Sequence, residues 1–397
     1  YEYLGNHGMI KLILSIITMI GLVLFVNIGV FNETTKLVVY IIGSSVIIDA
    51  FSGTFTSMFR AYEQMEYQSI AEIINSVTMF IGVLFCVFTK QSVIGVASIY
   101  LISTVLVLIY NFAMCTKNYG LIHFQVNLKL WKYLIYTAFP LAITSIFALI
   151  SFKMNTILLN ILTTSAHVGE YTAAFNLMQA LIFIPTVYST AILPIFSKFY
   201  VNRPDMLEYS YKKSLKYLTI LSVPISMGTM VLSKKIILFM YGSAYINTIP
   251  VLELIIWALP AIFLSYILGT SIASINKQHE TVKATFICLL FSTIGNFILI
   301  KLFDSTGAAM ITVINEVSMV LFYMYIMHKY GYSVPLRSIL LKPFIASVVM
   351  GGVIYLLDLD LFVSIGVGII VYFTTILLIK TFNEDDWNIF KQLLPQK

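Results

Sequence analysis

Long apolar stretches, separated by short polar joints, run the whole length of the chain. Each stretch is about 20 residues long, the length that an α-helix needs to cross the hydrocarbon core of a bilayer. The alternation typical of β-strands does not accompany them. The pattern therefore predicts an all-α polytopic membrane protein with about twelve transmembrane helices, at residues 9–31, 36–58, 68–88, 92–114, 131–160, 168–197, 212–233, 249–273, 282–301, 305–328, 337–356 and 360–380.

Composition and charge agree with that prediction and orient the helices. Of the 397 residues, 59% are hydrophobic and only 11% are charged, unlike a soluble protein. Cytoplasmic loops retain Lys and Arg during insertion. With a cytoplasmic N-terminus, 18 of the 24 basic residues fall inside, five fall outside, and Lys153 alone falls within a span. Both termini are therefore expected in the cytoplasm, and the net charge of +6 reflects topology, not a nucleic-acid partner.

The cysteine and histidine residues do not form a pattern typical of metal ligands. Cys86, Cys115 and Cys288 lie in or at the ends of predicted spans, and the five histidines are scattered singly. This spacing predicts neither disulfides nor a zinc site. We therefore expect no metal site and no resident cofactor.

An internal repeat is the next signal in the chain. AEIINSVTMFIG (71–82) aligns with ATFICLLFSTIG (284–295) at an offset of 213, and GVASIYLISTV (95–105) aligns with GAAMITVINEV (307–317) at an offset of 212. The first four spans then correspond to spans seven to ten in the same orientation, which predicts a parallel repeat. The counterparts of spans five and six would precede Tyr1, so we expect a fragment that lacks two helices of a fourteen-helix protein.

The repeat predicts the domain organisation. A first lobe of four spans covers 1–115, and a cytoplasmic linker at 116–130 joins it to a second lobe of six spans at 131–330. Two extra spans follow at 331–381, and a cytoplasmic interfacial tail helix is expected at 382–397.

Three segments resemble a known family. Residues 152–200 contain a basic residue, then Asn155 and a threonine, a short loop ending in Val-Gly-x-Tyr, and a helix that ends on a Pro and a Ser-Lys. Residues 237–260 contain a Met-x-Gly-x-x-Tyr turn, and residues 295–325 contain Gly-Ala-Ala followed by a membrane glutamate. Together these segments resemble the Wzx-type polysaccharide and lipid-linked oligosaccharide flippases of the multidrug/oligosaccharidyl-lipid/polysaccharide exporter superfamily, which includes the MATE-like transporters.

The resemblance implies a fold and a function. Two helical lobes would flank a cavity that opens alternately to each side of a prokaryotic cytoplasmic membrane. The cargo would be a polyprenyl-diphosphate-linked glycan, moved by an ion-coupled cycle using Na⁺ or H⁺. Membrane lipids, a glycan polymerase and glycosyltransferases would be its partners. In one position the chain departs from the family pattern: Asn155 stands where an aspartate is usual.

Candidate substrate-cavity residues cluster on the predicted fifth helix. At 100° per residue, Lys153, Thr156 and Asn160 share one face, and Asn155 lies on a neighbouring polar stripe. A lysine within a span usually faces water or a partner. Lys153 is therefore predicted to attract the diphosphate as a point charge. The alternative is that its side chain snorkels to the outer interface.

The sixth span adds two further cavity candidates and a hinge. Asn176 and Gln179 are one helical step apart and are predicted to donate hydrogen bonds to sugar hydroxyls. The alternative for both is hydrogen bonding between helices. Pro185 interrupts the same span and is a candidate hinge, although prolines in membrane helices also serve packing.

Two carboxylates near the middle of predicted spans are candidates for ion coupling. Asp49 and Glu316 lie in spans two and ten, too deep for snorkelling. Intramembrane carboxylates usually titrate or bind cations, so either residue can take up a proton or Na⁺. The alternative is a neutral carboxyl group hydrogen-bonded between helices.

Three other functions compete with a flippase. A drug/cation antiporter of the same superfamily would have only twelve helices in its two lobes. A membrane glycosyltransferase or polymerase would use an acidic pair such as Asp358 and Asp360, but it would also need larger outer loops than this chain has. A major-facilitator carrier would carry a basic Gly/Asp/Arg loop motif, which the region 58–67 lacks. We therefore predict a transporter and not an enzyme.

Overall fold

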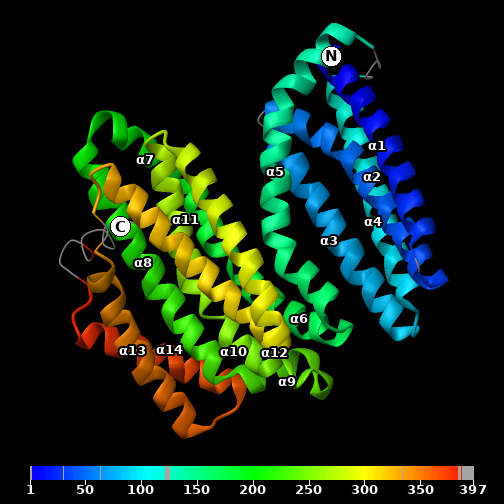
Figure 1. Cartoon of the computed structure of the whole chain (residues 1–397). Coiled ribbons are helices and arrows are strands. Elements are labelled where there is room, and N and C mark those ends of the chain that lie inside the picture. The colour runs from blue at the N-terminus through cyan, green and yellow to red at the C-terminus, as the bar shows by residue number, and fades with distance from the viewer. Residues whose placement is uncertain are drawn as a thin grey trace. The chain divides into compact units, whose positions relative to one another are not determined.

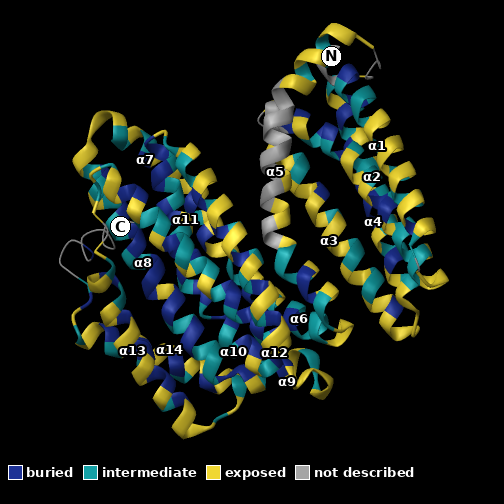
Figure 2. Ribbon diagram, viewed as in Figure 1, coloured by how far each residue is buried: buried dark blue, intermediate teal, exposed yellow. Residues whose placement is uncertain are grey.

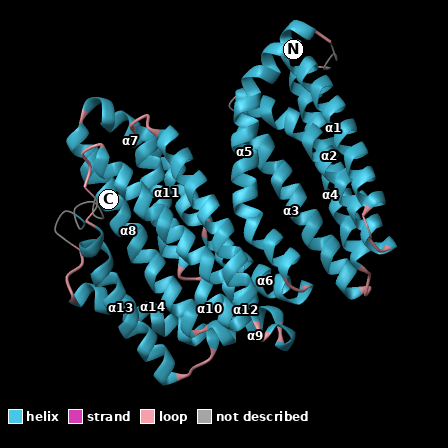
Figure 3. Cartoon of the chain, viewed as in Figure 1, coloured by secondary structure: helices cyan, strands magenta, loops and turns pink. Residues whose placement is uncertain are grey.

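The computed structural model describes residues 2–29, 31–62, 64–120, 126–333, 335–382 and 386, with the side chains of 2–4, 60, 61, 137–145, 147, 148, 151 and 152 left undescribed. Within these ranges the regular structure is entirely helical (Figure 3). Among the described residues, ten helical stretches are long and apolar enough to cross a membrane by length and composition. The chain is therefore a multi-pass membrane protein, and the all-α prediction is confirmed.

The chain divides into two compact units, Tyr1–Ser145 and Ile146–Lys397, here called unit 1 and unit 2. The division falls inside one long helix, α5, whereas the sequence places the start of the second lobe at 131. Of the predicted tail helix at 382–397, only residues 382 and 386 are described, so that prediction lies almost wholly outside the described residues.

Unit 1 consists of four helices and the beginning of α5 (Figure 1). Their bounds are α1 (Glu2–Ile28), α2 (Glu33–Ala61), α3 (Met65–Phe88), α4 (Val93–Tyr119) and α5 (Leu128–Leu162). The first four helices match the first four predicted spans, and α4 packs against both α2 and α3.

Unit 2 contains the remaining helices, some of them interrupted. Their bounds are α6 (Ser165–Leu181), α7 (Phe183–Asn202), α8 (Pro204–Val231), α9 (Ser233–Tyr241), the 3₁₀ turn η1 (Ser243–Tyr245), α10 (Thr248–Ile255), α11 (Ala258–Ser274), α12 (Gln278–Lys329), α13 (Leu336–Leu357) and α14 (Leu361–Leu378). Helices α6 and α7 fill the predicted sixth span, α10 and α11 the eighth, and α12 both the ninth and tenth.

The interruptions in unit 2 follow from two prolines. Proline has no N–H for the carbonyl four residues earlier, and its ring clashes with that carbonyl. The break between α10 and α11 lies just before Pro260, and the Ser226 hydroxyl donates 3.0 Å to the carbonyl of Ile256, which Pro260 leaves without its helical donor. The break between α6 and α7 is at Ile182, three residues before Pro185. At the α10–α11 break, the Ser226 hydroxyl and the Leu259 N–H, at 3.1 Å, thus both satisfy the Ile256 carbonyl where no water is present.

Helix α12 is a hairpin of two antiparallel arms. Asp304 has φ 48° and ψ −126°, which reverses the chain between the arms. A Cβ built on Gly307 would lie 2.0 Å from the carbonyl oxygen of Leu299, and one on Gly295 would lie 2.3 Å from Ile311. The arms therefore touch through glycine, because the backbones approach too closely for any side chain.

The same glycine contact occurs in both units. In unit 1, a Cβ on Gly82 would lie 2.2 Å from Ile99, and in unit 2 one on Gly295 would meet Ile311 at 2.3 Å. The two glycines are the pair that the sequence repeat aligns, and so are the two isoleucines. Equivalent residues thus make equivalent helix contacts, which supports the predicted repeat.

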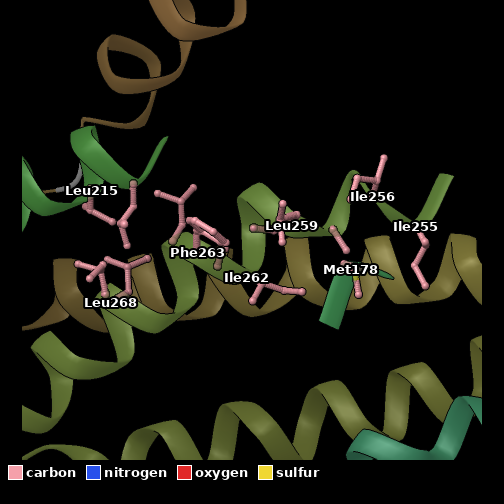
Figure 4. Close-up of a cluster of buried hydrophobic side chains, with 14 of the residues drawn as sticks. Met178, Leu215, Ile255, Ile256, Leu259, Ile262, Phe263 and Leu268 are labelled. Carbon is pink, nitrogen blue, oxygen red and sulfur yellow. The ribbon is translucent and has the colours of Figure 1, made fainter. Parts of the chain in front are cut away.

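The core of unit 2 is formed by apolar side chains of α6, α8, α10 and α11. In Figure 4 these side chains follow one another along the cluster, with Leu215 near Phe263 at one end and Met178 near Ile255 at the other, and each of these four is almost fully buried. Many large apolar side chains on the outer faces are exposed instead (Figure 2). An apolar exterior is the surface that a membrane-embedded helix presents to lipid.

Candidate functional site

A polar network lies inside unit 2, where α5, α6 and α12 meet. The Asn155 amide nitrogen donates to the hydroxyl oxygens of Thr312 at 2.8 Å and Tyr171 at 3.3 Å. The Asn155 oxygen accepts a 2.7 Å hydrogen bond from the Asn296 amide nitrogen. The Tyr171 and Thr312 hydroxyls lie 3.0 Å apart, and Thr312 also donates to the carbonyl of Ala308. These contacts join both arms of the α12 hairpin to α5 and α6.

The network is built from amides and hydroxyls. Asn155 occupies the position where the family pattern has aspartate, so this position carries no charge here. Its hydrogen-bond partners Tyr171, Thr312 and Asn296 are also uncharged. The Asn296 oxygen is buried and has no hydrogen-bond partner among the described residues. One unpartnered oxygen among otherwise mutually bonded groups does not make a cation site, because cations in proteins need several oxygen ligands. The network therefore acts first as a neutral connection between helices.

Replacing Asn155 tests this connection. In Asn155→Leu, the Thr312 and Tyr171 hydroxyls and the Asn296 amide lose a partner inside a membrane protein. We expect the free energy of unfolding to fall by about 2 kcal/mol. Asn155→Asp should fold nearly as well as the parent, because a Tyr171 hydroxyl can rotate to donate to the carboxylate. Thermal unfolding in detergent measures both effects.

The matched control for that comparison is Asn160→Leu, because Asn160 lies on the same helix and is exposed. It should change the unfolding temperature little. An Asn155→Leu protein as stable as Asn160→Leu would contradict the role given to the network.

The other cavity candidates on α5 lie away from the packed core of unit 2. Lys153 and Asn160 are exposed and Thr156 is half-buried, so the face predicted from the helical period is the more open one. The same face also carries Ile157, which is 47% exposed. These three polar residues therefore share a face with each other but are not joined to the Asn155 network by the hydrogen bonds described above.

The candidates on α6 belong to a longer polar face. Asn176 and Gln179 are exposed, and the same face continues onto α7 through the exposed Thr186 and Thr190. The sequence prediction missed both threonines, although their spacing from Gln179 follows the helical period. Pro185 is buried beside them. Its role as a hinge stays a prediction, located now at the α6–α7 break.

Glu316 and Asp49 lie in separate units. Glu316 is half-buried on the second arm of α12, one helical turn after Thr312, and so lies near the Asn155 network. Asp49 is on α2 in unit 1. The sequence places the two carboxylates in separate spans, two and ten, and their part in ion coupling stays a prediction.

Asp49 lines a polar cavity that the sequence did not predict. The cavity has a volume of about 340 Å³ and lies between α2, α3 and α4. Glu72 also lines it and accepts a 2.8 Å hydrogen bond from Gln68. The Ser103 hydroxyl bonds to the Asn75 side chain at 2.6 Å. The cavity thus places two carboxylates among polar side chains within one membrane unit, and the Lys11 ammonium lies 3.6 Å from the Cβ position of Gly53 in its lining.

The Asp358–Asp360 pair behaves as a structural turn. Lys235 binds the Asp358 carboxylate at 2.6 Å and the carbonyl of Leu359 at 2.6 Å. This hydrogen bond and the charge of Lys235 lower the pKa of Asp358. Asp360 precedes the first residue of α14. A carboxylate already neutralised by a lysine is a poor metal ligand, which weakens the glycosyltransferase alternative.

Fold and site together define a class. The chain is a polytopic membrane protein built from repeated helical units, each with polar side chains gathered in its interior. The family model described as "Polysaccharide biosynthesis protein" matches residues 1–200, and a second model, "MatE", matches residues 140–298. The chain belongs to the polysaccharide biosynthesis protein family.

A curated relative and two solved structures are similar to the chain. The "Probable low-salt glycan biosynthesis flippase Agl15" of Haloferax volcanii is 27% identical over 254 residues, which cover 61% of this chain and 53% of that protein. The chain thus spans about half the length of this relative. The structure titled "Lipid II flippase MurJ, inward closed conformation" has a TM-score of 0.78 at 19% identity, covering 95% of this chain and 83% of that one.

The second structure is an inward-facing multidrug resistance MATE family transporter of the MOP superfamily. Its TM-score is 0.70 at 14% identity, with coverage of 82% of this chain and 80% of that one. At these identities the two structures establish the fold, which is the MATE-like fold expected from the sequence. The similarity of fold alone does not separate a lipid flippase from a drug exporter.

Proposed function

We propose that the protein is an alternating-access flippase that moves a polyprenyl-diphosphate-linked glycan across the prokaryotic cytoplasmic membrane. The family assignment and the similarity to a named glycan flippase support this proposal. The relatives are flippases and transporters, and the proposal is that this protein likewise transports its cargo without altering it chemically. The positive-inside distribution of Lys and Arg supports a cytoplasmic location for both termini.

The single observation that carries the choice of cargo is an apolar cavity formed with the two extra helices. It has a volume of about 500 Å³ and is lined almost entirely by apolar side chains of α8, α13 and α14, among them Ile220, Met350 and Phe373. The drug-exporter alternative has only the twelve helices of its two lobes and lacks the two additional helices that help to form this cavity. A segment of polyprenyl chain would fit this surface, because each buried methylene contributes roughly 0.8 kcal/mol.

The glycan end of the cargo would meet the polar faces of unit 2. Lys153 is proposed to attract the diphosphate, since a lysine carries a compact point charge at the end of a four-carbon stem. Thr156 and Asn160 on the same face of α5, with Asn176 and Gln179 on α6, would hydrogen-bond sugar hydroxyls. A glycan polymerase and glycosyltransferases are the proposed pathway partners. Glycosyltransferases would assemble the lipid-linked glycan that the flippase moves, and the polymerase would use it after translocation.

Filling the apolar cavity tests the choice of cargo. Gly228 lines it, and a Cβ there would meet only the end of Met350 at 3.6 Å. Gly228→Phe should therefore place a ring in the cavity and weaken binding of a long-chain polyprenyl-diphosphate glycan by at least roughly tenfold, from the loss of a few buried methylenes. Binding of a short-chain analogue should change little. Fluorescence titration of the purified protein measures both.

The control is Gly366→Phe, because Gly366 lies on α14 with nothing within 4 Å of its Cβ position and is not part of the cavity lining. Long-chain affinity in Gly228→Phe that equals that of Gly366→Phe and of the parent would favour the drug-exporter alternative.

Coupling to Na⁺ or H⁺ is proposed for Glu316 and Asp49. Glu316 lies beside the network that joins both arms of α12 to α5 and α6, so a change in its charge can alter how those helices pack. Asp49 shares a cavity with Glu72 in unit 1. Two carboxylates in one cavity repel each other, and uptake of a cation or a proton relieves that repulsion.

Removing one carboxylate tests the coupling. Glu316→Gln keeps the shape of the side chain but removes its charge, so transport by this variant should no longer respond to an imposed Na⁺ or H⁺ gradient. Transport in reconstituted vesicles, with and without each gradient, measures the response. Glu33→Gln is the control, because Glu33 is exposed in the first turn of α2. A gradient response that Glu316→Gln leaves intact would remove Glu316 from the mechanism.

A further inference from the structure

A second polar pocket lies at one end of unit 2, between α8, α13 and the segment that follows α14. It has a volume of about 350 Å³. Four lysines line it, Lys212, Lys213 and Lys216 from α8 and Lys342 from α13. We call it the basic pocket. The substrate-cavity and ion-coupling candidates described above are not among its lining residues, so it is a separate site.

The sequence concentrates positive charge here at an energetic cost. Lys212, Lys213 and Lys216 lie within two turns of α8, on the side that packs against α13, where Lys342 adds a fourth ammonium. Like charges at these spacings repel, and the repulsion grows as solvent is excluded. Such a cluster persists only where anions compensate it.

The structure shows how one anion is held. The Asp386 carboxylate is fully buried and accepts hydrogen bonds from Lys213, from Lys216 at 2.5 Å and from the Tyr217 hydroxyl at 2.8 Å. Two ammonium groups and a hydroxyl converge on a pair of oxygens. A phosphate group presents oxygens of the same kind and binds to the same donors.

Asp386 does not exhaust the capacity of the pocket. Lys212 pairs with Glu208 at 2.6 Å, so among the described residues two carboxylates stand against the four lysines. The Lys342 ammonium donates to the backbone carbonyl of Lys380, which is neutral. Thr381 is 95% buried and lines the same pocket, and its buried hydroxyl has no hydrogen-bond partner among the described residues.

We propose that the basic pocket binds the phosphate of an anionic phospholipid headgroup, with Lys342, Lys216 and the Thr381 hydroxyl as its donors and the Asp386 carboxylate as a built-in competitor. The negative charge of the phosphate would offset part of the positive charge of the lysines. One of its oxygens would accept the hydrogen bond for which the Thr381 hydroxyl has no acceptor among the described residues. When Asp386 occupies its position, the pocket retains a weaker attraction for the lipid.

A lipid is the favoured source of the phosphate because of where the pocket lies. It is at the ends of membrane-spanning helices, where headgroup phosphates gather, and basic pockets between transmembrane helices on the cytoplasmic side bind such headgroups. Lys213 lies 5.4 Å from the centre of the Tyr209 ring and Lys216 lies 5.8 Å from that of Phe382. Aromatic side chains beside lysines are typical of the membrane interface. A free phosphate ion is the competing source.

Native mass spectrometry of the purified protein, titrated with phosphatidylglycerol, tests the proposal. Lys342→Gln should bind this lipid about fivefold more weakly, the expected loss for one interfacial lysine. Asp386→Asn should bind it more tightly than the parent protein, because the competing charge is gone. Lys198→Gln is the matched control, since Lys198 is exposed and predicted on the same membrane face. It should bind as the parent does.

Two further arms separate the sources of phosphate. Phosphatidylcholine should bind more weakly than phosphatidylglycerol, and inorganic phosphate at the same concentration should leave the unfolding temperature unchanged. Equal phosphatidylglycerol binding by Lys342→Gln and Lys198→Gln would overturn the site. If inorganic phosphate raises the unfolding temperature as much as phosphatidylglycerol does, and if this increase is lost in Lys342→Gln, the lipid assignment is overturned. Binding by Asp386→Asn equal to that of the parent would overturn the role of Asp386 as competitor.

Discussion

Gly307→Ala is expected to prevent unit 2 from folding into a stable form. A Cβ at this position would lie 2.0 Å from the carbonyl oxygen of Leu299, 2.4 Å from its carbonyl carbon and 2.9 Å from the backbone nitrogen of Ile300. Backbone atoms of a neighbouring helical arm cannot rotate away as a side chain can. The two arms of α12 must therefore separate, at a cost of about 3 kcal/mol or more, the upper end of overpacking penalties.

The measurement is the yield of monodisperse protein after detergent extraction, together with its unfolding temperature. Gly366→Ala on α14 is the control, because nothing lies within 4 Å of the added Cβ. Gly95→Ala should be milder than Gly307→Ala, although the repeat aligns the two glycines, because its closest contact, at 2.8 Å, is with the side chain of Gln91. If Gly307→Ala has the same unfolding temperature as Gly366→Ala, the arms of α12 do not pack as closely as described.

Lys153→Ala is expected to reduce transport of a diphosphate-linked glycan by roughly a hundredfold. A hydrogen bond to a charged group contributes about 1.5–3 kcal/mol, and every 1.4 kcal/mol corresponds to about tenfold in affinity. Lys153→Arg should retain much of the activity, since it keeps the charge. Initial rates in reconstituted vesicles measure the loss.

Two controls separate this role from a general effect of charge. Lys301→Ala removes an exposed lysine from α12 and should leave the rate unchanged. The unfolding temperature of Lys153→Ala should equal that of the parent, because Lys153 is itself exposed. A Lys153→Ala protein with the rate of Lys301→Ala would leave the residue as a snorkelling lysine with no part in transport.

The helices could be predicted well from the sequence, because the thickness of the membrane sets the length of a spanning helix. Stretches of about 20 apolar residues must be helical where no water is present to satisfy the backbone. The repeat was also visible, because Gly82 and Gly295 each pack tightly against an isoleucine that the repeat aligns. The breaks at Ile182 and before α11 were less visible, since a proline shows where a helix is weakened but not whether neighbouring hydroxyls repair it.

The candidate site was predicted only in part. Asn155 was found through a departure from a family pattern, but its partners Tyr171 and Thr312 are residue types common in membrane helices and gave no local signal. Their side chains meet only when α6 and the second arm of α12 pack against α5. The cavity around Asp49 was missed for the same reason, because Glu72 and Asn75 come from a different helix. Sequence period predicts which residues share a face, whereas packing decides which faces meet.

The most direct test of the account is translocation by the purified protein in liposomes. A fluorescent polyprenyl-diphosphate-linked oligosaccharide is placed in both leaflets, and an impermeant quencher reports the fraction that reaches the accessible side over time. The account predicts that the protein equilibrates this lipid faster than empty liposomes do and does not move a lipophilic drug cation against an ion gradient. Gradient-driven transport of the cation, with the lipid-linked glycan left at the rate of empty liposomes, would contradict it.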